Sequence, residues 1–155
     1  AIPARASAPV AATTSPTLIS EGRPATASVR GNLGPATVVT SSVVDDWLKD
    51  RWQAASNMQG TPIKGGHWVE VDLQRRCQIS RATVDWETAF ASDYVLLGKG
   101  KGSDGGESEV RLAEGQSAST TSSKQHVVHA LEVEGGARGS WVSVVRLDIR
   151  KPATR

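Results

Sequence analysis

The chain has 155 residues and a formal net charge of +2, which results from 18 Lys and Arg residues against 16 Asp and Glu residues. No run of Lys and Arg is longer than two residues, which excludes the basic stripe typical of nucleic-acid-binding proteins. Cys77 is the only cysteine, which excludes an intramolecular disulfide, and no apolar run approaches the ~18 residues that span a bilayer. A chain of this length has room for one domain with a core of its own.

Residues 1–17 are almost entirely Ala, Pro, Ser and Thr, a composition that buries too little apolar surface to offset the entropy lost on ordering. We therefore predict a tail or linker at residues 1–17, a single domain at residues 18–151 and a short C-terminal tail at residues 152–155. A spacer that joins the domain to a partner module is the alternative interpretation of the first segment.

From Leu18 onward the apolar residues recur with period two, which is typical of β-strands, and Gly- or Ser-rich stretches separate the runs. The pattern predicts strands at residues 67–73, 81–87, 94–99, 126–134 and 141–150. Only residues 41–52 have room for a helical turn. A series of strands without long helices indicates an all-β fold, an antiparallel sandwich or jelly roll.

Two short motifs resemble functional sites but are better explained as structure. The string GKGSDG at residues 100–105 has the glycine spacing of a dinucleotide-binding loop, yet no helical pattern follows it, so we expect a hairpin loop. His126 and His129 lie three apart in a predicted strand and point to opposite faces, so they cannot share one metal ion. His129 shares its face with Val127 and Leu131 and is expected to be buried and hydrogen-bonded.

The chain has five tryptophans but only one phenylalanine and one tyrosine. Trp52, Trp68 and Trp86 lie in or next to strand patterns and are expected in or near the core. Trp47 and Trp141 are flanked by loop residues. An indole in a loop either fills a hydrophobic gap or offers a flat surface on which a sugar ring can stack.

Four segments follow one another along the chain: EGRPATAS, VVDDWLKDRWQA, HWVEVDLQRRCQISRATVDWETAFASDYVLL and WVSVVRLDIR. Their order and spacing resemble the discoidin family, also called coagulation factor 5/8 type C domains, together with the related family 32 carbohydrate-binding modules. The resemblance covers residues 18–151 and implies a non-catalytic antiparallel jelly-roll β-sandwich of the galactose-binding-domain-like type. The packing residues that it implies are Trp68, Val69, Val71, Leu73, Ile79, Val84, Trp86 and Tyr94.

The resemblance implies that ligands bind to loops at one end of the sandwich, here residues 45–50, 53–67, 88–93 and 136–141. Relatives that bind galactose commonly use a His, Arg and Asn set, but the segment TAFASD at residues 88–93 supplies neither Arg nor Asn. Galactose specificity is therefore not carried over. The candidate ligand-binding residues form a surface able to stack on and hydrogen-bond a sugar, and they are Trp47, Lys49, Gln53, Phe90, Asp93 and Trp141.

The resemblance also implies a candidate site for a structural calcium ion, which many relatives hold. Asp45 matches the family's ligand aspartate and Asp50 is a second candidate ligand, but Arg146 stands where relatives have a glutamate ligand. A cation at that place repels calcium, so we expect Arg146 to pair with Asp45 or Asp50 in place of the metal. The alternative is that the aspartates still bind calcium and Arg146 turns outward. No other cofactor is expected.

These features predict a non-catalytic binding module, secreted or at the cell surface, that binds a glycan or polysaccharide weakly, with a Kd of about 10 µM to 1 mM. The alternative is a protein-interaction or adhesion module that uses the same loops. Binding to nucleic acid is not expected, and binding to an anionic membrane is disfavoured because Lys49 and Arg51 form only a thin basic collar. Cys77 is either buried or available to link two chains.

Overall fold

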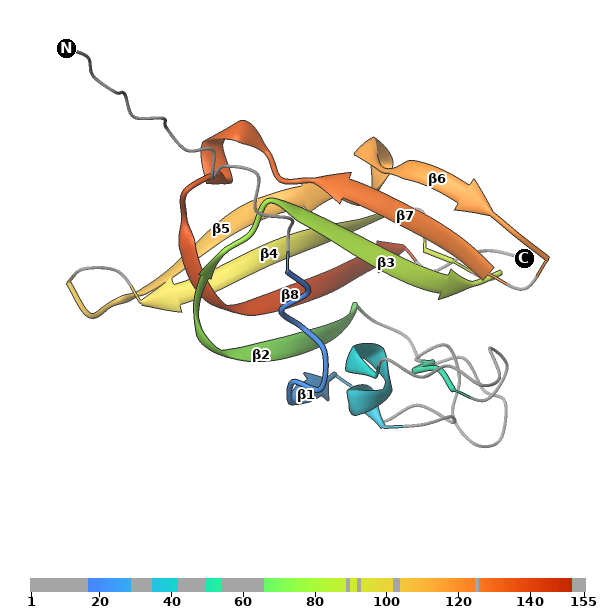
Figure 1. Cartoon of the computed structure of the whole chain (residues 1–155), viewed down its shortest axis with the longest axis horizontal. Helices are drawn as coiled ribbons and strands as arrows, with labels where there is room; N and C mark the ends of the chain where they lie inside the picture. The colour runs from blue at the N-terminus through green and yellow to red at the C-terminus, as the bar shows by residue number, and fades with distance from the viewer. Residues whose placement is uncertain are drawn as a thin grey trace, which may run out of the picture.

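Within its described residues, the chain forms eight strands in two antiparallel sheets, and the only helical elements there are short 3-10 turns. The five-stranded sheet has the order β1-β2-β8-β4-β5, and the three-stranded sheet has the order β3-β7-β6. Figure 1 shows β3, β7 and β6 side by side, overlapping the strands of the larger sheet in this view. The predicted all-β antiparallel sandwich is confirmed. The computed structural model describes residues 17–28, 35–41, 50–53, 66–88, 90–91, 93–101, 104–124 and 126–151.

The eight strands are β1 Ala25–Ala27, β2 His67–Gln78, β3 Arg81–Glu87, β4 Asp93–Lys101, β5 Glu107–Glu114, β6 Ser119–Ser122, β7 His126–Glu132 and β8 Trp141–Lys151. The 3-10 turns are η2 Ala36–Thr40, η3 Gly115–Ser117 and η4 Gly135–Ala137. No helix in this part of the chain is long and apolar enough to cross a membrane. Each strand predicted from period two is present. Most of the predicted helical turn, residues 42–49, lies outside the described residues, as do residues 1–16 and 152–155 of the predicted tails.

The core lies between the two sheets, and the pairing of β2 with β8 decides which β2 side chains enter it. His67 and Val69 pair with Ile149 and Leu147, which belong to the same cluster as core residues of β7. Trp68, the residue between them, therefore points to the outer face, because successive side chains of a strand alternate. The prediction that Trp68 packs in the core was wrong: His67 is buried there instead, and Trp68 is half-buried outside.

The rest of the core agrees with the predicted packing residues. Val71 is half-buried on the inner face of β2. Cys77 is buried, 8% exposed, and its Sγ lies 3.9 Å from the carbonyl oxygen of Arg75, so the thiol is enclosed rather than presented to a second chain. The other predicted residues are buried or packed against the core, and these are Val69, Leu73, Ile79, Val84, Trp86 and Tyr94.

Strands β4 and β5 form an antiparallel hairpin in which Lys101 pairs with Glu107. The first two residues of the GKGSDG string therefore end β4, and a second strand, β5, rather than a helix comes after the string. The expected hairpin is confirmed. A dinucleotide-binding loop needs a helix N-terminus at this place, so the string is not such a loop.

Candidate functional site

Strand β8 runs from one end of the sandwich to the other. Its first residue, Trp141, pairs with Gln78 of β2, and its last residue, Lys151, pairs with Asp93 of β4. With a rise of ~3.3 Å per residue, β8 is roughly 33 Å long, so Trp141 and Asp93 lie too far apart to contact one sugar ring. In Figure 1, η4 and the end of β4 lie on the left and the end of β8 lies on the right. We name these the Trp141 end and, after Phe90 just before β4, the Phe90 end.

The single ligand-binding surface predicted from the sequence is thus wrong in its geometry. The structure places Phe90 and Asp93 at one end and Trp141 at the other, so the loops at 88–93 and 136–141 do not form one site. Trp47 and Lys49 lie outside the described residues. The ligand-binding role of each residue stays a prediction.

The side chains of Phe90, Gln53 and Trp52 contact other protein groups. Phe90 is half-buried and meets the ring of His129 edge to face, with 5.2 Å between the ring centres. Gln53 accepts hydrogen bonds from the guanidinium of Arg51 at 3.0 and 3.3 Å. Trp52 packs against the core, as expected. Among the described residues, this end offers no widely exposed aromatic side chain.

His129 is the centre of a buried hydrogen-bond network that joins β3, β4 and β7. Its Nδ1 lies 3.1 Å from the indole Nε1 of Trp86 and 2.8 Å from the hydroxyl of Tyr94. Because an indole N–H only donates, Nδ1 accepts, and the proton of the neutral ring is on Nε2. Burial lowers the pKa of His129; burial also raises the pKa of Tyr94 to about 12, against a smaller opposite effect of Trp86. The predicted buried, hydrogen-bonded histidine is confirmed.

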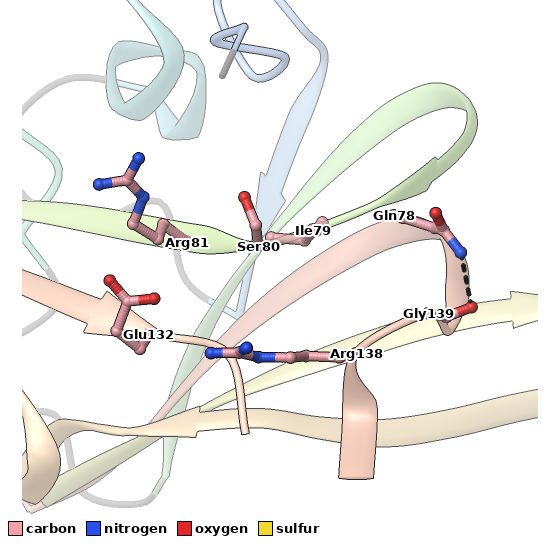
Figure 2. A pocket seen from close by; sticks show the side chains of 7 residues that line it. All are labelled: Gln78, Ile79, Ser80, Arg81, Glu132, Arg138 and Gly139. Carbon is pink, nitrogen blue, oxygen red and sulfur yellow. Dashed lines mark hydrogen bonds between the residues drawn. The ribbon is translucent and has the colours of Figure 1, made fainter. Parts of the chain in front are cut away.

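Trp141 is the one widely exposed aromatic side chain among the described residues, with 51% of its surface accessible. The guanidinium carbon of Arg76 lies 5.9 Å from the centre of its ring. Next to its strand partner Gln78, an open pocket of about 480 Å³ lies between the β2–β3 turn and the segment that leads from η4 into β8 (Figure 2). The lining residues are Gln78, Ile79, Ser80, Arg81, Glu132, Arg138 and Gly139.

Backbone geometry holds one wall of this pocket in place. Gly139 has a φ of +87°, in the left-handed region that favours glycine, and this lets the chain turn into β8. The side-chain amide of Gln78 donates to the carbonyl oxygen of Gly139 at 2.9 Å, the dashed line in Figure 2. The N–H of Ser140 donates to the carbonyl of Ala137 at 3.0 Å, and Ala137 is buried. The turn is therefore anchored at both ends.

The Trp141 end has guanidinium groups without carboxylate partners. Arg81 and Arg138 line the pocket with one carboxylate, Glu132, and Figure 2 shows the guanidinium of Arg138 directed towards Glu132. In the part of the chain that the structure describes, neither these side chains nor Arg76 form an ion pair. Arg138 uses its Nε to donate to the carbonyl of Val133 at 3.4 Å. Its terminal N–H groups are left to meet ligand oxygens.

Arg146 lies on the outer face of the five-stranded sheet. Its guanidinium carbon is 4.4 Å from the centre of the Trp68 ring, and its Nη1 is 3.6 Å from the carboxylate of Glu70. The expected ion pair with Asp50 is therefore corrected to one with Glu70, while Asp45 lies outside the described residues. Within the described ranges, no three His, Cys, Asp or Glu side chains are grouped so that they could hold a metal ion.

Sequence reasoning missed three charged residues of the pocket. Arg81 is the first residue of a predicted strand and Glu132 lies near the end of another, but only the antiparallel pairing of β3 with β7 makes them neighbours. Arg138 lies in the Gly-rich segment GGARGS, where an arginine is normally solvated. The available signal was that this segment leads directly into the loop tryptophan Trp141.

A scan against protein-family models and a search of curated proteins found no match. Solved structures that match are chitosan-binding modules of a chitosanase/glucanase from Paenibacillus sp. IK-5. A selenomethionine-labelled mutant of module 1 has a TM-score of 0.59 and 18% identity over 88% of this chain and 87% of that chain. Module 2 in complex with chitotriose has a TM-score of 0.58 and 14% identity over 88% of this chain and 90% of that chain. At these identities, the likeness establishes the β-sandwich fold.

Proposed function

We propose that this domain is a non-catalytic carbohydrate-binding module that binds a polysaccharide at the Trp141 end. The observation that carries the proposal is the half-exposed indole of Trp141 beside an open pocket of hydrogen-bonding groups. The likeness of the fold to chitosan-binding modules, one in complex with chitotriose, supports it. The resemblance of the sequence to the discoidin family also supports it, and with that resemblance we propose a secreted or cell-surface location.

The chemistry of the Trp141 end suits a sugar. An exposed indole is a flat apolar surface against which the C–H face of a pyranose ring can pack. Sugar hydroxyls both donate and accept hydrogen bonds, and the pocket supplies the amide of Gln78, the carboxylate of Glu132 and the N–H groups of Arg81. Because the pocket is open, a single site is expected to bind with a Kd of about 10 µM to 1 mM.

Replacing Trp141 by alanine is expected to weaken polysaccharide binding about 30-fold, or ~2 kcal/mol, because the change removes the stacking surface. Affinity electrophoresis in gels that contain soluble polysaccharides measures this, followed by calorimetry with the polysaccharide bound best. Leu18→Ala shortens another exposed apolar side chain, 70% accessible, and as the control it leaves binding unchanged. If Trp141→Ala binds like the parent domain and Phe90→Ala does not, the binding site is at the Phe90 end instead.

We further propose that the fold is stable without a structural calcium ion. The support is Arg146, which by the resemblance to the discoidin family stands where relatives have a glutamate ligand, and which contacts Trp68 and Glu70. A fixed cation repels a second cation nearby. The melting temperature is expected to agree within about 1 °C in EDTA and in added calcium, measured by scanning calorimetry. A fall of several degrees in EDTA would instead indicate that Asp45 and Asp50 bind the ion.

A further inference from the structure

We infer that the ligand of the Trp141 end is an acidic polysaccharide whose sugar rings carry carboxylate groups, as polymers of uronic acids do. The inference rests on the proposed function and adds the class of ligand. The solved structures that share the fold are chitosan-binding modules, and chitosan is a polymer of amino sugars. The charged side chains that line the pocket favour the opposite class.

Three arginines lie around the exposed indole and the pocket. The guanidinium of Arg76 is 5.9 Å from the ring centre of Trp141, and Arg81 and Arg138 line the pocket. None of the three forms an ion pair with another described residue. A sugar chain that extends from the indole into the pocket therefore meets guanidinium groups at both places.

Fewer carboxylates than arginines line the pocket, although Asp104 and Glu107, in and after the β4–β5 turn, also lie at this end of the sandwich. Among the described residues that line the pocket, Glu132 is the only one with a carboxylate. Glu134, two residues further on, is paired with Arg111, whose Nε lies 3.3 Å from its carboxylate. The local charge at the pocket is therefore positive, although the chain as a whole carries only +2.

Guanidinium groups discriminate between acidic and basic sugars. An arginine side chain has five N–H donors and no acceptor, so it cannot accept a hydrogen bond from an amino sugar. The ammonium groups of chitosan would be repelled by the same charge. A carboxylate on a sugar ring, in contrast, matches the planar fork of a guanidinium, which donates two parallel hydrogen bonds to its two oxygens.

A polysaccharide fits this surface better than a membrane or a nucleic acid. Trp141 is the only large apolar side chain exposed at this end in the described part of the chain, since the other two, Leu18 and Val39, lie near β1 and η2. Insertion into a membrane needs several apolar side chains with a basic collar. Single-stranded nucleic acid is held by successive aromatic platforms, and one indole provides one platform.

The test compares polygalacturonate, dextran sulfate, neutral dextran and chitosan in calorimetry and affinity electrophoresis, with anionic vesicles and single-stranded DNA as further probes. The parent domain is expected to bind polygalacturonate at least tenfold more tightly than dextran or chitosan, and less tightly as salt rises. Arg81→Gln with Arg138→Gln is expected to lower this affinity about tenfold or more. Arg150→Gln, which removes an exposed charge near the other end of β8, is the control and retains the affinity within about twofold.

Several outcomes would overturn the inference. If dextran binds as well as polygalacturonate and the arginine variants bind normally, the ligand class is wrong but the proposed function stands. If no polysaccharide binds, the proposed function fails as well. If the domain binds dextran sulfate, anionic vesicles or DNA more tightly than polygalacturonate, the ligand is a different anion and the uronic-acid class is wrong. Because Arg138 also donates to Val133, Arg81→Gln alone tests the inference if the double variant unfolds; it is expected to retain the parental melting temperature and to lose affinity.

Discussion

Alanine in place of Gly115 is expected to lower the free energy of unfolding by about 3 kcal/mol or more. Gly115 begins η3 and is buried against the ring of Tyr94, which is 1% exposed. A Cβ atom at Gly115 would lie 2.5 Å from Cδ1 and 2.8 Å from Cζ of that ring. The ring cannot move away easily, because its hydroxyl is hydrogen-bonded to the buried His129.

Urea denaturation and thermal melting measure this effect. For a domain of this size, a loss of about 3 kcal/mol lowers the melting temperature by roughly 6 to 12 °C. Gly136→Ala is the matched control, since a Cβ at Gly136 meets no atom within 4 Å, and its stability is expected to change by less than about 0.5 kcal/mol. If Gly115→Ala melts with the parent domain, the close packing of η3 on Tyr94 is incorrect.

The close contact at Gly115 shows where sequence reasoning stops. Alternation of apolar residues predicted strands such as β3 and β7 correctly, because buried and more exposed side chains alternate along them. Strand β4 is buried on both faces at Tyr94, Val95 and Leu96, and the run predicted as a strand there is continuously apolar rather than alternating. The segment around Gly115 has no such pattern, and Gly115 was simply part of a Gly- and Ser-rich stretch. The same stretch hides β6, Ser119–Ser122, whose side chains are all exposed, so no apolar alternation marks it. Contacts made by backbone and by polar strands are not encoded in apolar periodicity.

The candidate site was predicted in its parts but not in its arrangement. The sequence left two interpretations of Trp141, an indole that fills a hydrophobic gap or an exposed stacking surface, and its 51% exposure favours the second. Its separation from Phe90 and Asp93 depends on the direction and register of β8, which are set by pairing with β2 and β4. The pairing of β2 with β8 also decides that His67, and not Trp68, faces the core, since a shift of one residue exchanges the two faces of a strand.

Replacing His129 by leucine is expected to lower the free energy of unfolding by about 2 to 4 kcal/mol. The two side chains are similar in size, but leucine has no acceptor, so the Trp86 N–H and the Tyr94 O–H lose their buried partner. Tyr94→Phe removes one of these donors and is expected to cost less, about 1 kcal/mol. His126→Leu is the control on the same strand, because His126 is only half-buried and contacts the exposed Ser123.

The pH dependence of stability distinguishes loss of the His129 network from loss of packing. Burial holds the pKa of His129 below its ordinary value of 6.5, so the unfolded chain takes up this proton first as the pH falls. The contribution of His129 is therefore complete above pH 6.5 and decreases below it, by up to ~1.4 kcal/mol per pH unit, until the folded state is protonated too. Urea denaturation of the parent domain between pH 7 and pH 5 is expected to show this decrease, and His129→Leu is expected to show a shallower one. Equal slopes for the two proteins would mean that His129 is not kept neutral by the fold, and that the cost of the leucine is a cost of packing alone.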